Sequence, residues 1–189
     1  MRVRGRLGRG VLVGLVLLAL LDSIIVAAGA AGFRINQTAS MPMGLYRLHA
    51  LGGEPLVRGL VVAVCPSGQA LQVGSSRGYL RPGSCPGNVE PLLKRIEGEA
   101  GDTVGVSDDG VTVNGTRLAH SARVAQDCLA RPVPRIPAGH YRVGTGKIWL
   151  YAPVPRSWDS RYFGPQSARD VVGVATPVLI VGEGTPCGG

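Results

Sequence analysis

The sequence predicts a mainly β protein that follows one membrane-spanning helix at the N-terminus. Three observations support this fold class. The 189 residues include 29 glycines and 14 prolines, which suits short strands joined by many turns. Residues 11–33 form one long apolar run, and no later segment has helical spacing apart from a weak pattern over 120–130. With 45% apolar and 17% charged residues, the chain can bury a core.

The first ten residues are basic and contain no acid, so we expect residues 1–10 to stay in the cytoplasm. Their arginines are Arg2, Arg4, Arg6 and Arg9. Because basic segments beside a membrane span remain on the cytoplasmic side, the rest of the chain would be exported. In a bacterium this predicts a single-pass inner-membrane protein with its domain on the periplasmic side. The other charges of the net +8 form no basic stripe, which disfavours nucleic-acid binding.

Residues 11–33 are expected to be a transmembrane anchor, because a spanning helix needs about 20 apolar residues. Asp22 in the middle would cost roughly 3 kcal/mol, but each surrounding Leu, Val or Ile returns about 0.3–0.6 kcal/mol. A cleaved signal peptide is the alternative, since its basic start, apolar run and small residues are also present. The run is longer than the usual signal-peptide core of about 7–15 residues, which favours a retained anchor.

Residues 34–189 are expected to form one exported β domain. Short strand-like segments alternate with turn residues, and Asn114-Gly115 predicts a tight hairpin turn inside one of them. Residues 66–90 are predicted to be a loop-rich insertion. The predicted strands cover residues 44–51, 60–65, 91–98, 102–107, 110–119, 139–144, 147–153 and 171–181.

The cysteines predict disulfides rather than a metal site. Cys65, Cys85, Cys128 and Cys187 form an even set with no C-x-x-C pair and no histidine at zinc-finger spacing, so we expect neither metal nor cofactor. In an oxidising compartment they would form two disulfides, and four cysteines allow three pairings. Cys65–Cys85 is the preferred pair because these residues flank the insertion, which leaves Cys128–Cys187. Free buried thiols are the alternative.

The segment TASMPMGLY, residues 38–46, places Ser40 shortly after the apolar run. A nucleophilic serine needs a base to accept its proton. The chain's histidines, His49, His120 and His140, occur in no G-x-S-x-G or other recognisable triad context. A lysine could replace histidine if burial lowered its pKa from about 10.4.

Lys94 is the better candidate of the two lysines. In the predicted strand PLLKRIEG, alternation places Lys94 on one face with Leu92 and Ile96, and apolar surroundings disfavour an ammonium. The alternative is a lysine whose stem lies along the strand while its amine reaches solvent. Lys147 begins its strand beside glycines and is expected to be more solvated.

Five segments in order resemble the conserved boxes of the type I signal peptidase family. They are SMPMGLY, PLLKRIEGEAGDTV, PAGHYRV, SWDSRYFGP and VVGVATPV, and they cover the chain from the anchor to about residue 180. The residue-by-residue sequence of these segments is most similar to the conjugative-transfer branch of the family, the TraF-type peptidases. In place of the G-D-N-R run of housekeeping signal peptidases, this chain has WLYAPVPRSWDSR. The resemblance therefore implies a signal-peptidase-like β catalytic domain of the specialised branch.

The resemblance also implies roles for individual residues. Ser40 would be the nucleophile and Lys94 its general base. The hydroxyl of Thr38 would help to bind the oxyanion together with the backbone N–H of Ser40, where donors are needed as charge develops.

The distal S-x-D-S-R box adds three supporting residues by the same resemblance. Ser157 matches the hydroxyl that orients the lysine amine, and Asp159 matches the acid of the box. Arg161 would pair with Asp159 across one strand face.

The function implied is a serine endopeptidase that processes a membrane-tethered precursor protein, which pairs with a sheet edge as an added strand. The TraF-type resemblance implies a pro-pilin of a conjugation apparatus as substrate, and such enzymes can join pilin ends into a ring. One alternative is a housekeeping signal peptidase, and another is a non-enzymatic, disulfide-stapled membrane assembly protein. A self-cleaving repressor with the same dyad is disfavoured by the apolar run and by the lack of a DNA-binding segment.

Overall fold

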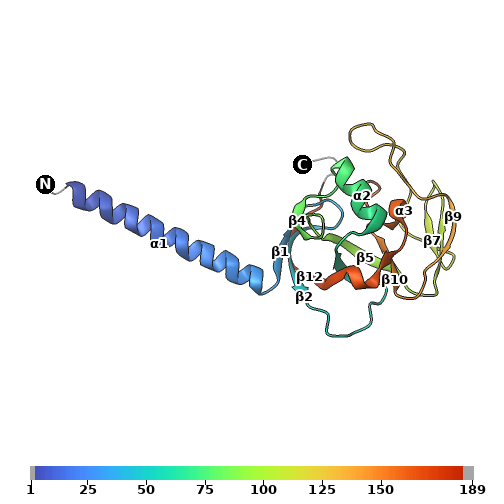
Figure 1. Cartoon of the computed structure of the whole chain (residues 1–189), viewed down its shortest axis with the longest axis horizontal. Coiled ribbons are helices and arrows are strands. Elements are labelled where there is room, and N and C mark those ends of the chain that lie inside the picture. Colours follow the sequence, from blue (N-terminus) through green and yellow to red (C-terminus); the bar gives the residue numbers. More distant parts are fainter. Residues whose placement is uncertain (1–2, 185–189) are drawn as a thin grey trace. The chain divides into compact units, whose positions relative to one another are not determined.

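The computed structural model describes residues 3–184 and is drawn in Figure 1. The chain divides into two compact units, Met1–Arg34 and Ile35–Gly189.

The first unit is dominated by the helix α1 (Val3–Ala30). By length and composition its segment Arg9–Ala30 could cross a membrane, although a signal sequence would pass the same test. Its large apolar side chains are exposed; Leu17 and Val26, for example, are 60% and 71% exposed. The helix ends at Ala30, before the predicted end at residue 33, and Phe33 begins the first strand.

The second unit is built on two β-sheets, and this confirms the mainly β prediction. The larger sheet has the strand order β1-β2-β12-β3-β5-β10-β11 and the smaller has the order β8-β7-β6-β9. The strands of the larger sheet are β1 (Phe33–Asn36), β2 (Met43–His49), β12 (Val171–Gly182), β3 (Val61–Val64), β5 (Leu92–Gly98), β10 (Lys147–Tyr151) and β11 (Gln166–Ser167). Those of the smaller are β8 (Thr116–Arg117), β7 (Val111–Val113), β6 (Thr103–Val106) and β9 (Gly139–Arg142).

Every predicted strand is present, and the predicted segment 110–119 forms the hairpin β7–β8. Its turn residues Asn114 and Gly115 have φ angles of 50° and 82°. Two successive positive φ angles match the tight turn that suits the twist of a hairpin, and Asn-Gly is the pair that tolerates them.

Strand β10 joins the cores of the two sheets. Ile148 and Leu150 pack with Val62 and other residues of the larger sheet. Trp149, whose side chain points to the opposite face, packs among the valines of the smaller sheet. Strand β10 therefore contributes side chains to both hydrophobic cores.

Residues 66–90 differ from the prediction of a loop-rich insertion. They contain the helix α2 (Gly68–Arg77) and the short strand β4 (Pro82–Cys85). Glycines give α2 a poor intrinsic propensity, but Ala70 and Val73, one turn apart, pack against a cluster that includes Trp158. The tertiary contacts outweigh the local preference, so the expectation that no helical segment follows the anchor apart from residues 120–130 was wrong.

The weak helical pattern over residues 120–130 forms no helix. This segment consists of turns and irregular chain, with one bridge between Gln126 and Pro132. A short helix, α3 (Ser160–Phe163), instead follows β10, and a 3₁₀ turn (Ala168–Asp170) precedes β12.

The disulfide predicted at the insertion is present between Cys65 and Cys85. Cys128 is also disulfide-bonded. Its predicted partner, Cys187, lies outside the described residues. The alternative of free thiols is therefore wrong for the three cysteines that the structure describes.

Candidate active site

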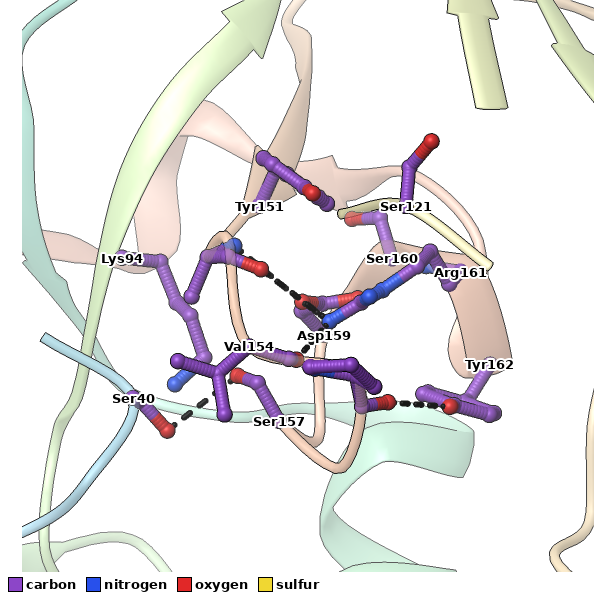
Figure 2. A network of polar contacts seen from close by, with 12 residues as sticks. Ser40, Lys94, Ser121, Tyr151, Val154, Ser157, Asp159, Ser160, Arg161 and Tyr162 are labelled. Carbon is purple, nitrogen blue, oxygen red and sulfur yellow. Dashed lines mark hydrogen bonds and ion pairs between the residues drawn. The ribbon is translucent and has the colours of Figure 1, made fainter. Parts of the chain in front are cut away.

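Ser40 lies in the loop between β1 and β2, residues 37–42. Pro42 ends this loop, and its carbonyl accepts a hydrogen bond of 2.8 Å from the hydroxyl of Tyr46, a buried residue of β2. The Ser40 hydroxyl is partly buried and accepts a hydrogen bond of 3.1 Å from Ser157 Oγ. The loop thus brings Ser40 to the S-x-D-S-R box, 117 residues later in the chain (Figure 2).

Asn36, the last residue of β1, organises the same loop from inside. Its side-chain oxygen accepts hydrogen bonds from the backbone N–H and the hydroxyl of Thr38, at 3.1 and 2.8 Å. The Thr38 hydroxyl is therefore directed to Asn36 in this structure. An Asn that precedes a Ser/Thr-rich turn is a signal for such a side-chain turn, and the sequence reasoning missed it.

Lys94 lies in the middle of β5, which is flanked in the sheet by β3 and β10. Its side chain is only 2% exposed, and Ile96 on the same face is completely buried. The prediction of an apolar environment is confirmed, and the alternative of an amine that reaches solvent is wrong. The amine donates a hydrogen bond of 3.2 Å to the carbonyl of Leu93.

Burial lowers the pKa of Lys94 from its ordinary value of 10.5 to about 8. The negative charge of Asp159 raises this pKa and the positive charge of Arg161 lowers it, so these two smaller effects oppose each other. A lysine with this pKa is neutral in an appreciable fraction of molecules near neutral pH. It can accept a proton.

The side chains of Lys94 and Ser157 extend toward Ser40 in Figure 2. Among the hydrogen bonds of the described residues, none joins the Lys94 amine to Ser40 or Ser157. The resemblance assigned Ser157 to the lysine amine, whereas in this structure its hydroxyl bonds the serine. Catalytic hydrogen bonds are often long in substrate-free enzymes and tighten when substrate binds.

Asp159 and Arg161 form an ion pair that is fully buried. The Arg161 Nε and Nη2 atoms donate to the two carboxylate oxygens at 2.8 and 2.7 Å, a bidentate arrangement. Asp159 also caps the N-terminus of α3 by accepting from the backbone N–H of Arg161 at 3.1 Å. The pairing is thus made at a helix cap and not across a strand face.

This ion pair fixes the loop that carries Ser157. Asp159 accepts from the backbone N–H of Ala152 at 3.1 Å, and Arg161 donates to the carbonyls of Ala152 and Val154. Tyr162, which the sequence reasoning missed, donates to the carbonyl of Pro155 at 2.7 Å. In Figure 2 the pair lies on the side of this loop away from Ser40, and Ser157 faces Ser40.

The other candidate groups lie elsewhere. His49 contacts Thr176 at 2.9 Å, and neither His120 nor His140 has a hydrogen bond with Ser40 or Lys94 in the described part of the chain. No group of three or more metal-ligating side chains occurs within residues 3–184. The site is therefore a serine and a buried lysine, supported by a serine and an ion pair.

The chain matches known proteins along nearly all of its length. The family model described as signal peptidase, peptidase S26, matches residues 7–180. The plasmid transfer protein TraF of Escherichia coli is 39% identical over 159 residues, which cover 81% of this chain and 86% of that protein. The probable conjugal transfer protein TraF of Sinorhizobium fredii is 38% identical over 179 residues, 93% of each chain.

Among solved structures, a signal peptidase I from Enterococcus faecalis aligns with 65% of this chain and 98% of its own, with 22% identity and a TM-score of 0.39. The family match and the two relatives each extend over both the Ser40 loop and the Lys94 strand. On this evidence the chain belongs to the signal peptidase family, peptidase S26.

Proposed function

We propose that this protein is a membrane-anchored serine endopeptidase that cleaves a precursor protein with a Ser40–Lys94 dyad. The observation that carries the proposal is the burial of Lys94, which lowers its pKa to about 8, on the side of the sheet that faces Ser40. Burial of a lysine amine costs folding free energy, and groups with strongly shifted pKa values are concentrated at functional sites. A lysine with a lowered pKa can act as a base because part of it is neutral near neutral pH. Family membership supports the same assignment.

The reaction follows from these groups. Neutral Lys94 takes the proton of the Ser40 hydroxyl while Oγ attacks the scissile carbonyl carbon of an extended precursor segment. The Lys94 ammonium then gives its proton to the departing amine, which leaves an acyl-enzyme on Ser40. A water molecule, deprotonated by Lys94, then attacks the ester carbon. The C–Oγ bond breaks, the Lys94 ammonium returns its proton to Ser40 Oγ, and the cleaved segment leaves with a free carboxylate.

The developing oxyanion needs donors. None of the described residues accepts a hydrogen bond from the backbone N–H of Ser40, so this group is available for the oxyanion. Thr38 would be the second donor after its hydroxyl leaves Asn36. Ser157 holds Ser40 Oγ in the free enzyme and would release it as Lys94 approaches.

We place the active site on the periplasmic side of the inner membrane. Residues 1–10 would lie in the cytoplasm, residues 11–33 would contain the anchor and residues 34–189 would form the exported domain. The apolar helix α1 and the Cys65–Cys85 disulfide support this arrangement, because disulfides persist in oxidising compartments.

The proposed substrate is a pro-pilin of a conjugative transfer system. This rests on the relatives that are named as plasmid or conjugal transfer proteins. The acyl-enzyme also gives a route to a cyclic pilin, because the amine at the other end of the pilin could attack the ester in place of water. A housekeeping signal peptidase would share the dyad but would accept signal peptides of many exported proteins.

The test is co-expression with the candidate pro-pilin and measurement of the intact mass of the product. The Ser40→Ala variant should leave the precursor uncut, and Ser75→Ala, at an exposed serine of α2, should process it normally. Mature-length pilin in the Ser40→Ala strain would refute the proposal and favour a non-enzymatic assembly role. A mature pilin lighter by one water molecule would show cyclisation.

A further inference from the structure

The side-chain amide of Asn36 uses its full hydrogen-bonding capacity within the loop that carries Ser40. Its Nδ2 lies 3.1, 2.9 and 3.0 Å from the carbonyls of Thr38, Met41 and Pro42, so its two N–H groups are shared among three acceptors. Its Oδ1 accepts from the N–H and the hydroxyl of Thr38. An amide has two N–H donors and one oxygen with two acceptor sites, so this side chain is saturated.

These contacts enclose Ser40 from both sides. The carbonyls bound to Asn36 belong to residues before and after Ser40, and the loop between them curls around the amide. With its carbonyls turned toward Asn36, the loop leaves the Ser40 hydroxyl directed to Ser157 and its N–H without an acceptor among the described residues. The two Ser40 groups that the reaction needs, its hydroxyl and its N–H, are thus ones that Asn36 does not engage.

We infer that Asn36 is a positioning residue, which holds the loop 37–42 in the conformation that presents Ser40 Oγ to the base and Ser40 N–H to the oxyanion. The inference deepens the proposed function and rests on it. Misplacing a reacting group by about 1 Å costs about a hundredfold in rate. We call the Asn36 contacts with Thr38, Met41 and Pro42 the clamp. Because the clamp positions Ser40, we expect its loss to lower kcat rather than substrate affinity.

The clamp also constrains Thr38. A hydroxyl has one hydrogen, and Thr38 gives it to Asn36 at 2.8 Å. In the free enzyme the Thr38 hydroxyl therefore donates to Asn36, and this hydrogen bond must break before the hydroxyl can donate to the oxyanion. Asn36 still holds the Met41 and Pro42 carbonyls after that exchange, so its positioning role should persist when the Thr38 hydroxyl is absent.

The experiment compares Asn36→Ala with a matched control, Asn114→Ala. Asn114 also fixes a turn with its side chain, by bonds to Thr103 N and Asp102 Oδ1 at 2.9 and 2.7 Å, but it lies in the smaller sheet. The full-length proteins are purified in detergent and assayed with a fluorogenic peptide that spans the cleavage site of the precursor. The Ser40→Ala variant is run in parallel, and backbone amide exchange is followed for every variant.

We expect Asn36→Ala to lower kcat about a hundredfold, to leave KM within about threefold of the wild type, and to keep its cost in a Thr38→Val background. Amide exchange should speed up at Thr38, whose N–H is bound by Asn36, and stay unchanged in β5. A kcat within about threefold of that of Asn114→Ala would overturn the inference. So would a loss confined to KM, or a cost that vanishes in the Thr38→Val background.

The remaining outcomes are also decisive. A melting temperature lowered by more than about 5 °C relative to Asn114→Ala would mean that Asn36 supports the fold at large, against a local role. If Ser40→Ala retains activity, the proposed function fails by itself. Amide exchange then tests the positioning role of Asn36 separately, because unchanged exchange at Thr38 in Asn36→Ala would disprove it.

Discussion

At the scale of single residues, the burial of Lys94 lowers the pKa of its amine at a cost in stability. Its position between β3 and β10 removes the amine from water, and no carboxylate forms an ion pair with it among the described residues. The free-energy penalty falls on the ammonium form. The same penalty lowers the pKa to about 8 and makes the amine available as a base.

The first prediction concerns the pH dependence of the reaction. Because only neutral Lys94 can accept the Ser40 proton, kcat/KM should rise with pH along one limb centred near the Lys94 pKa of about 8 and then level off. Steady-state rates on the precursor peptide between pH 6 and 10 measure this limb. A rate that is flat over this range would show that no group of this kind is the base.

The second prediction concerns stability. The difference between 10.5 and about 8 corresponds to roughly 3 kcal/mol against the buried ammonium. Below pH 8 the folded and unfolded chains both carry the proton, so the full penalty is present; it fades as the folded state loses its proton between pH 8 and 10.5. Lys94→Met should therefore raise the free energy of unfolding at pH 7 by about 1–3 kcal/mol, with a smaller gain at pH 9.5.

Urea unfolding of the two proteins at both pH values measures this gain. Lys147→Met is the control, because Lys147 is exposed and its replacement should change stability by less than about 0.5 kcal/mol. A Lys94→Met protein that is less stable than the wild type at pH 7 would contradict this prediction and would mean that Lys94 makes a net stabilising contribution.

At the scale of elements, the site depends on a short loop between β10 and α3 that is held by buried charge. The carboxylate of Asp159 receives four hydrogen bonds, three from Arg161 and one from Ala152 N–H. These bonds connect the end of β10 to the cap of α3 and fix Ser157 between them.

The third prediction is that Asp159→Ala destabilises the fold and not only the site. Removing one partner leaves the Arg161 charge buried and unpaired, which costs about 3–5 kcal/mol. Glu90→Ala is the comparison, because the Arg81–Glu90 pair is 3.9 Å apart and half-exposed, and such pairs contribute about 0–1 kcal/mol. Equal unfolding free energies for the two variants would contradict the structural role of the buried pair.

The elements themselves were predictable to different degrees. Strands such as β5 and β7 follow from alternation and turn residues, which are local signals. The helix α2 could not be predicted from local signals, because its sequence favours a helix only when Ala70 and Val73 can pack against the cluster of Trp158. Long-range contacts of this kind are absent from a single segment.

The site was predictable in its residues more than in its contacts. The order of the boxes pointed to Ser40 and Lys94 as the proposed dyad, and alternation placed Lys94 on the buried face of its strand. The bond from Ser157 to Ser40, the hold of Asn36 on Thr38 and the role of Tyr162 depend on how distant loops meet. Contacts between loops that are distant in the sequence cannot be predicted from the residue pattern of one segment.

At the scale of the whole molecule, the chain joins a helix able to cross a membrane to a β domain cross-linked around its insertion. The Cys65–Cys85 disulfide begins after β3 and ends with β4, so it encloses α2. Helix α2 contributes to the cluster that contains Trp158, next to the loop of Ser157.

The fourth prediction is that loss of this disulfide loosens the insertion. Closing a loop with a sequence separation of 20 residues contributes about 3 kcal/mol through the unfolded state. Cys65→Ala together with Cys85→Ala should lower the free energy of unfolding by about 2–4 kcal/mol, as measured by urea titration. Non-reducing peptide mapping of the exported wild type should recover Cys65 and Cys85 in one linked peptide, and finding them unlinked would disprove this pairing in the cell.

The central claim is that the Lys94 amine is the base of the reaction, and a comparison of Lys94→Arg with Lys94→Ala tests it most directly. A guanidinium keeps its proton at any working pH, so an arginine retains the positive charge but cannot accept the Ser40 proton. We expect both variants to leave the precursor uncut. A Lys94→Arg enzyme that retains more than about a tenth of the wild-type kcat/KM, a loss of less than about 1.4 kcal/mol, would contradict it.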